Sequence, residues 1–277
     1  MKDLLAEDYD AIFVGTGAPK GRELDLPGRY DTDQIFVGIA WLESVAFEHI
    51  ESVGERVLII GGGNTAMDCC RTSLRLGGKE VKVLYRGTRD RMKSSDWELE
   101  PALEEDVELI LNHSPEEYIV EEGKLVGMKF SVLEWHKDKN GKLKSTKKDE
   151  VIIPCDTVIL AIGQENSFPW VERDIGLDFD EWEVPHVDPI TYESTLSGVF
   201  FGGDSAFGPK NIIEAVEHGH QAAISIHKYC HNDSLTDRLP YGMNLVTAKM
   251  GIHEWTYSND YGYENRFEVP TVPMENR

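Results

Sequence analysis

The feature that most constrains the fold is a short apolar run, Val57–Ile60, that enters a glycine cluster and is followed by a helical pattern. This order predicts the strand, turn and helix of a dinucleotide-binding βαβ unit, with the spacing Gly61-x-Gly63-x-x-Ala66. The first glycine permits the tight turn, the second lets a pyrophosphate approach the backbone, and the alanine lets the helix pack closely on the strand. A glycine-rich turn without a ligand is the alternative interpretation. The candidate cofactor-binding residues here are Gly61, Gly62, Gly63, Asn64, Thr65 and Ala66.

The charge balance narrows the classes of partner. The chain carries 28 basic and 50 acidic residues, a formal net charge of −22. Such an excess of negative charge argues against binding to nucleic acid or to an anionic membrane surface, because both attract Lys and Arg. No apolar run approaches the ~20 residues of a membrane span, and the N-terminus lacks the features of a signal peptide. We therefore expect a cytoplasmic protein with no nucleic-acid or membrane partner.

The four cysteines include no Cys-x-x-Cys pair. A metal site built by this chain alone, whether zinc or iron–sulfur, is therefore not expected. No disulfide framework is suggested, which fits a reducing cytoplasm. Cys69 and Cys70 fall within the helix predicted after the glycine turn, where we interpret them as small packing residues, with a redox role as the alternative.

The hydrophobic pattern predicts an α/β chain in which short apolar strands alternate with helices. We expect strands at residues 11–14, 56–60, 80–85, 107–111, 127–132, 151–153, 157–162 and 198–204. We expect helices at 34–52, from the end of a turn at 61–66 to about residue 76, at 96–105 and at 211–229. Residues 136–148 are rich in Lys, Asp and Gly and are expected to form an exposed hairpin loop. Residues 164–198 are irregular, and the tail 231–277 shows no clear periodicity.

Three arginines follow the second strand of the predicted βαβ unit: Arg86, Arg89 and Arg91. In such units a carboxylate at this place binds the ribose 2′-hydroxyl of NAD, and a cation accepts the 2′-phosphate of NADP. A guanidinium directs two N–H donors at phosphate oxygens, so the pattern favours NADP over NAD. The alternative is a set of surface arginines, one of them paired with Asp90.

A second glycine constellation, Gly202-Gly203-Asp204, ends a short strand ahead of an alanine-rich helix. Asp204 at this position suits a sugar-like hydroxyl chain, and the amides near Ile212 and Ile213 suit an electron-rich ring edge. A plain strand–turn–helix with a capping aspartate explains the same residues equally well.

Several motifs occur in the order seen in one known family. They are Gly15-Thr16-Gly17-Ala18, Leu26-Pro27-Gly28, Gly61–Arg71, Tyr85-Arg86, Ala161-Ile162-Gly163-Gln164 and Gly202-Gly203-Asp204. This order resembles the small (beta) subunit of NADPH-dependent glutamate synthase and its relatives, among them the flavin module of dihydropyrimidine dehydrogenase and other flavoproteins similar to pyridine nucleotide–disulfide oxidoreductases. The resemblance covers roughly residues 9–230.

The resemblance implies a Rossmann-like NADPH-binding domain of three-layer ββα type, inserted in a partial FAD-binding domain. Residues 1–55 would then end the first FAD segment and cross over, 56–160 would bind NAD(P)H, 161–230 would form the second FAD segment, and 231–277 would be an extension. Asp204 matches an aspartate at the flavin ribitol, and Gly203, Ile212 and Ile213 fall where backbone amides approach the flavin. Gly163 joins the cofactor-binding set through its motif.

The chain departs from the family pattern in two respects. The FAD phosphate loop, a Gly-x-Gly-x-x-Gly near the N-terminus, is absent, and so is a cysteine-rich segment that holds iron–sulfur clusters. We therefore expect NADPH, with NADH as the alternative, to bind this chain by itself. FAD is expected to need a partner or an upstream segment. A smaller departure is Gly87, where relatives often carry a second arginine.

The resemblance implies an oxidoreductase that passes hydride from NADPH to FAD and electrons on to an iron–sulfur or other electron-accepting subunit, within a hetero- or homo-oligomer. Hydride transfer needs no acid or base, so no catalytic residue is assigned. One alternative is a non-catalytic nucleotide-binding subunit for assembly or regulation. Another, a disulfide reductase similar to thioredoxin reductase, would need a Cys-x-x-Cys pair.

Overall fold

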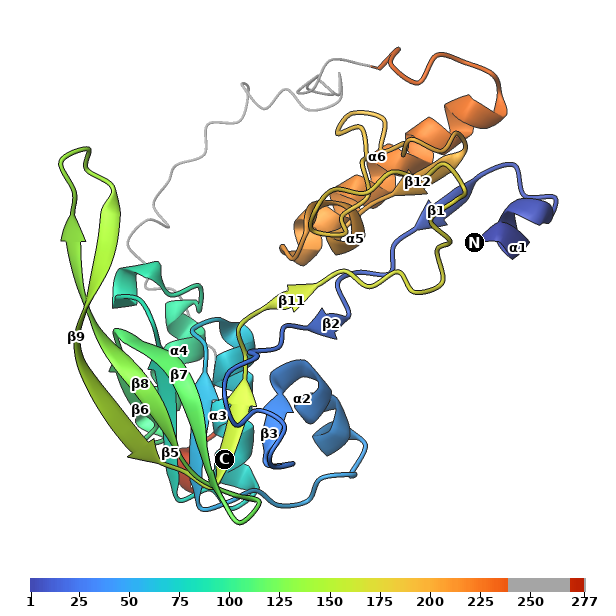
Figure 1. Cartoon of the computed structure of the whole chain (residues 1–277). Coiled ribbons are helices and arrows are strands. Elements are labelled where there is room, and N and C mark those ends of the chain that lie inside the picture. The colour runs from blue at the N-terminus through green and yellow to red at the C-terminus, as the bar shows by residue number, and fades with distance from the viewer. Residues whose placement is uncertain (239–269, 277) are drawn as a thin grey trace, which may run out of the picture. The chain divides into compact units, whose positions relative to one another are not determined.

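The structure, a computed structural model, describes residues 1–238 and 270–276 (Figure 1). It divides into a large unit, Met1–Asp233, and a small one, Ser234–Arg277. The described residues of the small unit include the short 3₁₀ helix η4 (Met274–Asn276). Most of the tail expected at 231–277 lies outside the described residues. Among the described helices, none combines the length and the apolar character needed to span a membrane.

A five-stranded parallel sheet forms the centre of the part that carries the glycine turn. Its strands, in spatial order, are β3 (Ile35–Val37), β10 (Thr157–Leu160), β4 (Arg56–Ile60), β5 (Glu80–Tyr85) and β6 (Glu108–Leu111). β4 lies between β10 and β5 in register, with Ile60 opposite both Leu160 and Leu84. The continuous apolar runs of β4 and β10 are explained by this central place, where both faces of a strand are buried.

Helices cover one face of this sheet and a second sheet covers the other (Figure 1). The helices are α2 (Gly38–Ala46), α3 (Asn64–Arg75) and α4 (Asp96–Glu104), preceded by the 3₁₀ helix η1 (Arg89–Arg91). The second sheet is antiparallel and contains β7 (His113–Glu121), β8 (Lys124–Lys137) and β9 (Leu143–Pro154). Ile59 packs toward the helices, whereas Leu58 packs toward the second sheet. The predicted three-layer ββα arrangement is confirmed.

A smaller core holds the remaining elements of the large unit. There β1 (Ile12–Val14) pairs in parallel with β12 (Val199–Phe201), and their side chains pack with those of Phe168 and Leu177. Its helices are α1 (Lys2–Ala6), α5 (Asp204–Phe207) and α6 (Ile212–Cys230). The chain passes between the two cores along β2 (Lys20–Gly21) and β11 (Gln164–Glu165), which pair with each other in antiparallel fashion.

Two predicted elements are wrong in part. The helix predicted at 34–52 is a strand, β3, followed by the shorter helix α2, because Ile35–Val37 pair with β10 and complete the edge of the sheet. The hairpin loop predicted at 136–148 is mostly strand, since β8 continues to Lys137 and β9 starts at Leu143. Only the turn between them remains, and there the carboxylate of Asp138 accepts the amides of Asn140 and Lys142.

Candidate functional site

The glycine turn between β4 and α3 has one closed position and one open position. Gly61 has a φ of +146°, and a Cβ there would lie 2.1 Å from the carbonyl oxygen of Ala161. Glycine is therefore required for the close approach of β4 and β10. At Gly63, by contrast, a Cβ would meet no atom within 4 Å, and φ is an ordinary −107°. The space in front of Gly63 is thus open, and it lies at the start of α3.

The other residues of the motif prepare this open side. Ala66 is fully buried against the sheet, and Gly62 lies under the ring of Tyr85, where a Cβ would be 2.7 Å from Cδ2. Helix α3 begins at Asn64 with no side chain capping it. The first amides of a helix have no acceptor within the helix, so those of Asn64 and Thr65 are directed at this end. An anion in front of Gly63 would meet these amides and the positive end of the helix dipole.

A segment that the sequence analysis did not identify closes one side of the turn. The amides of Lys93 and Ser94 both donate to the carbonyl of Gly62, at 2.9 and 3.0 Å. The amide of Ser95 donates to the side-chain oxygen of Asn64, at 3.2 Å. Ser95 is the N-cap residue of α4, and serine is favoured at that position, so the sequence could have indicated where α4 starts. It could not have indicated that this helix start contacts the glycine turn.

This contact changes the role of one predicted residue. The side-chain oxygen of Asn64 holds Ser95, so it fixes the 93–95 segment rather than facing a ligand. Thr65 is half-buried in the first turn of α3, and its amide remains available to an anion.

The three arginines after β5 have three different environments. Arg89 forms an ion pair with Asp96 at the start of α4, rather than with Asp90. The guanidinium of Arg91 lies over the ring of Trp135 on β8, 4.4 Å from its centre, and its carbonyl accepts the Tyr85 hydroxyl. Arg86 is exposed, and its guanidinium has no ion-pair partner among residues 1–238 and 270–276. Of the three, Arg86 is therefore the one whose guanidinium has neither an ion pair nor an aromatic stacking partner among the described residues.

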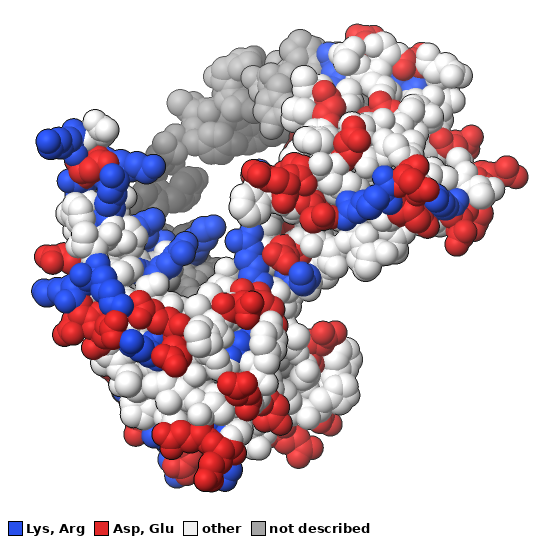
Figure 2. Space-filling model, viewed as in Figure 1, with Lys and Arg blue, Asp and Glu red and all other residues white. Residues whose placement is uncertain are grey.

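Positive charge gathers on the same part of the molecule. Figure 2 shows Lys and Arg side chains over the β8–β9 hairpin, while Asp and Glu dominate elsewhere on this face. The hairpin residues are Lys137, Lys139, Lys142, Lys144, Lys147 and Lys148. The stacking of Arg91 on Trp135 connects this hairpin to the end of β5. In a chain of net charge −22, such a local reversal reduces the repulsion of an anionic ligand.

The buried cysteines of α3 have no reactive character. Cys69 and Cys70 are both fully buried in the helix-side core. Burial raises the pKa of the Cys70 thiol to about 12, and it raises that of Cys69 as well. The thiolate is the reactive form of cysteine, so both residues act in packing, as predicted.

The second glycine constellation follows β12. Gly203 has a φ of +64°, and its amide donates to Nδ1 of His218, at 3.1 Å. The carboxylate of Asp204 accepts the amide of Lys210, at 3.1 Å, so it does cap the local loop. At the start of α6, Ile212 and Ile213 are each 81% exposed. The loop after β12 is thus held by the hydrogen bonds of Gly203 and Asp204, and it lies beside the exposed apolar start of α6.

His218 on α6 holds this loop through its hydrogen bond with the amide of Gly203. Its ring packs against Phe207 and Tyr192, with centroids 4.6 and 5.3 Å away. Burial, assisted by the charge of Lys210, lowers the pKa of His218. The neutral ring leaves Nδ1 free to accept from Gly203, so His218 positions the loop rather than carrying a proton.

Gly163 lies apart from both constellations, in the chain that leaves β10. It has a φ of +112°, and its carbonyl accepts the amide of Arg22, at 3.0 Å. The same crossover carries an ion pair between Lys20 and Glu165, at 2.7 Å. Gly163 therefore serves the junction of β2 with β11.

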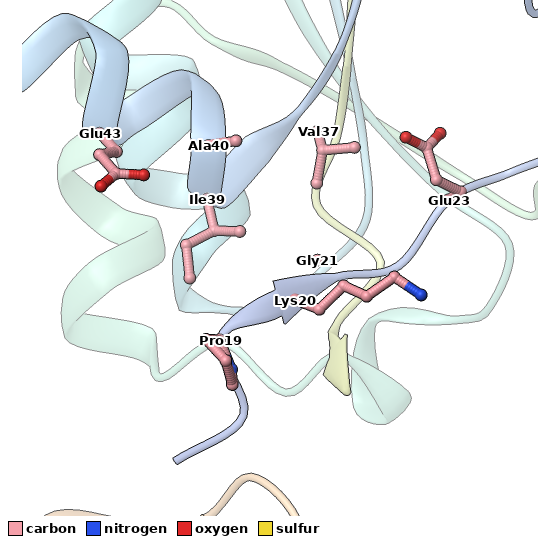
Figure 3. Close-up of a pocket in the computed structure, with 8 residues that line it drawn as sticks. All are labelled: Pro19, Lys20, Gly21, Glu23, Val37, Ile39, Ala40 and Glu43. Carbon is pink, nitrogen blue, oxygen red and sulfur yellow. The ribbon is translucent and has the colours of Figure 1, made fainter. Parts of the chain in front are cut away.

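A pocket of about 510 Å³ lies beside this junction (Figure 3). It is lined by Pro19, Lys20, Gly21, Glu23, Val37, Ile39, Ala40 and Glu43. Its cation, Lys20, already pairs with Glu165, and two carboxylates line the same space. The pocket includes none of the predicted site residues and suits a nucleotide phosphate poorly.

Comparison with known proteins agrees with this geometry. The sequence model of a family described as pyridine nucleotide-disulphide oxidoreductase matches residues 2–220. The chain belongs to this family. It is 30% identical to the NADP(+)-dependent formate dehydrogenase subunit beta of Moorella thermoacetica, over 91% of this chain and 36% of that protein. It is 31% identical to the glutamate synthase [NADPH] small chain of Halomonas elongata, over 81% of this chain and 51% of that protein.

Solved structures share the fold. FprA of Mycobacterium tuberculosis in complex with NADPH matches with a TM-score of 0.68 and 18% identity, over 84% of this chain and 66% of that one. Thioredoxin reductase of T. acidophilum matches with a TM-score of 0.59 and 19% identity, over 80% and 66%. The chain spans between about a third and a half of the length of its curated relatives.

Proposed function

We propose that this chain is the NADPH-oxidising, electron-input part of a flavoprotein oxidoreductase. In this proposal residues 56–160 bind NADPH, and residues 1–55 and 161–230 contribute to a flavin site. The observation that supports it most directly is the open space at Gly63, at the start of α3, beside a glycine that the fold itself requires at 61. An alanine at 61 would break the strand packing, whereas an alanine at 63 would fill only the space that a phosphate needs.

The residues present fit a dinucleotide phosphate. The turn offers helix amides, an open approach and no carboxylate of its own. Arg86 follows β5, where the adenosine ribose of a bound dinucleotide lies in this type of fold. Its guanidinium, which has no ion pair within residues 1–238 and 270–276, supports selection of NADPH over NADH. Arg89 contributes less because Asp96 already neutralises it.

The residues around Gly203 fit a flavin in part. The positive φ of Gly203 and the caps on its loop hold a rigid turn, and the exposed amide end of α6 faces the same region. Ile212, Ile213 and Val216 are exposed apolar side chains, and Phe13 on β1 is 44% exposed. Exposed apolar surface of this kind usually receives another component. We propose that FAD binds here together with a partner or an upstream segment that supplies its phosphate loop.

When bound, NADPH supplies a hydride and FAD accepts it. The contribution of this chain is to bind and orient the two groups, since no step at its own residues requires an acid or a base. We further propose an iron–sulfur or other electron-accepting subunit as the next component, in a cytoplasmic oligomer. The names of two relatives, the formate dehydrogenase subunit beta and the NADPH-Fe(3+) oxidoreductase subunit beta of Geobacter sulfurreducens, support a complex of several subunits.

Calorimetric titration of the full chain with NADP⁺ and with NAD⁺ tests the nucleotide site. We expect saturable binding of NADP⁺, tighter than that of NAD⁺. Absence of binding for both nucleotides would refute the proposal for this chain.

The flavin site is tested separately, by adding FAD and NADPH under anaerobic conditions and following the flavin absorbance. Loss of absorbance by the chain alone would show a complete flavin site, and loss only after the missing partner is added would support a shared one. A chain that binds NADP⁺ but never reduces FAD in either arrangement would instead be a nucleotide-binding assembly or regulatory subunit.

A further inference from the structure

The segment Lys93–Ser95 is fixed tightly against the glycine turn. Its first two amides both donate to the carbonyl of Gly62, and its third donates to Asn64. On one side it is anchored by Met92, which is 9% exposed and belongs to the helix-side core. On the other side it runs into α4, whose Leu99 is buried in the same core. The backbone position of Lys93 is therefore fixed, and its amide is hydrogen-bonded directly to the glycine turn.

The side chain of Lys93 is exposed, and its charge is not used within the protein. No hydrogen bond or ion pair reaches its ammonium group among residues 1–238 and 270–276. Two lysines near the same edge are paired: Lys79, just before β5, with Glu55, and Lys82 on β5 with Glu108. Lys93 instead places a cation with no ion pair among the described residues beside an open, amide-lined turn.

The position of Lys93 suits the phosphates in the middle of a dinucleotide. Its amide lies 2.9 Å from the carbonyl of Gly62, and the next residue is Gly63, with its open space. The four-carbon stem of a lysine is long and flexible enough to cross such a turn and place a compact charge over an anion. Arg86, in contrast, follows the adjacent strand β5, which is the place of the ribose.

We propose that Lys93–Ser95 lines the nucleotide site beside the glycine turn and that Lys93 binds the pyrophosphate of the pyridine nucleotide. The inference rests on the proposed function, because it assumes that a dinucleotide crosses Gly63. It assigns two cations to two groups. Lys93 acts on phosphates that NADP and NAD share, and Arg86 acts on the 2′-phosphate that only NADP carries.

The test compares Lys93→Gln with Lys124→Gln in the full chain. Lys124 is also exposed and without an ion pair in the described part of the chain, and it lies at the start of β8, outside the lysine-rich end of the β8–β9 hairpin, so the control removes the same charge elsewhere. The Lys93 substitution keeps the backbone amide that holds the segment, and thermal melting checks that both variants remain folded. Affinities for NADP⁺ and NAD⁺ are measured by calorimetry at low and at high salt.

We expect Lys93→Gln to weaken NADP⁺ and NAD⁺ by the same factor, roughly fivefold at low salt, as for one solvent-exposed charge. The effect should shrink at high salt, where the charge is screened. Equal affinities for Lys93→Gln and Lys124→Gln would overturn the inference. Loss of NADP⁺ affinity with unchanged NAD⁺ affinity would also overturn it, by placing Lys93 at the 2′-phosphate. If the unchanged protein binds neither nucleotide, the proposed function itself fails.

Discussion

Alanine substitutions at Gly61 and Gly63, the two outer glycines of the turn, should affect different properties: the stability of the fold at Gly61 and nucleotide affinity at Gly63. At Gly61 a new Cβ would lie 2.1 Å from a backbone oxygen, and φ is +146°. Neither Ala161 nor β4 can move away, because Ala161 directly follows β10 and its amide donates to the carbonyl of Ile60, the last residue of β4. Backbone strain of this kind costs about 1–3 kcal/mol before the clash is counted. We therefore expect Gly61→Ala to lower the free energy of unfolding by more than about 3 kcal/mol.

At Gly63 two small effects oppose each other. Alanine in an ordinary backbone conformation gains about 0.4–1 kcal/mol, because it restricts the unfolded chain. Alanine is also a poorer N-cap than glycine, at a cost of up to about 1 kcal/mol. The free energy of unfolding of Gly63→Ala should thus stay within about 1 kcal/mol of that of the unchanged protein. The methyl group, however, enters the open space proposed for the phosphates.

The assay pairs urea unfolding with calorimetric titration of NADP⁺. For Gly63→Ala we expect nearly unchanged stability and NADP⁺ affinity reduced about tenfold or more, since charge-assisted phosphate contacts would lengthen. For Gly61→Ala we expect the stability loss to dominate. If Gly63→Ala binds NADP⁺ as well as the unchanged protein, the phosphates do not cross Gly63, and the reasoning is refuted.

Three further outcomes are expected. Arg86→Ala should weaken NADP⁺ far more than NAD⁺ in the same titration, and Arg89→Ala should do so less because of Asp96; equal losses for both nucleotides would remove the 2′-phosphate assignment. Burial would raise the pKa of Glu105, but hydrogen bonds from Arg75 and Arg71 hold this pKa at about 2. The ionised carboxylate therefore stabilises the fold at pH values above its unfolded pKa, by on the order of 2 kcal/mol once the solvent exposure of Arg75 is considered. This stabilisation is lost as the pH falls toward 2. Glu105→Gln should flatten that part of the pH–stability curve, and an unchanged slope would contradict it. His218 has a lowered pKa, so its contribution is present above its unfolded value and lost as pH falls through the folded one; His218→Phe should remove this dependence, as measured by melting temperature against pH.

Local signals in the sequence gave reliable predictions where the pattern and its cause are both local. The strand Arg56–Ile60, the end of the helix after the glycine turn and the strand Glu80–Tyr85 agree with the structure to within a residue or two. Their apolar runs, glycines and helical spacing lie within a few residues of each other. The helix predicted at 34–52 failed because its first residues pair with β10, which lies more than a hundred residues away along the chain.

The sequence by itself determined the type of unit around Gly61–Ala66, because only glycine tolerates the contacts at 61 and 62 and only a small residue fits the buried position of Ala66. It also determined which residue types could meet a phosphate after β5. Only the tertiary structure decided which of them are available. Asp96 pairs with Arg89, Trp135 lies under Arg91, and Asn64 holds Ser95. The location of Lys93 beside the turn was likewise decided there, since its amide reaches Gly62 across thirty intervening residues. These pairings join distant segments, and no local pattern encodes which distant side chain a charge will meet.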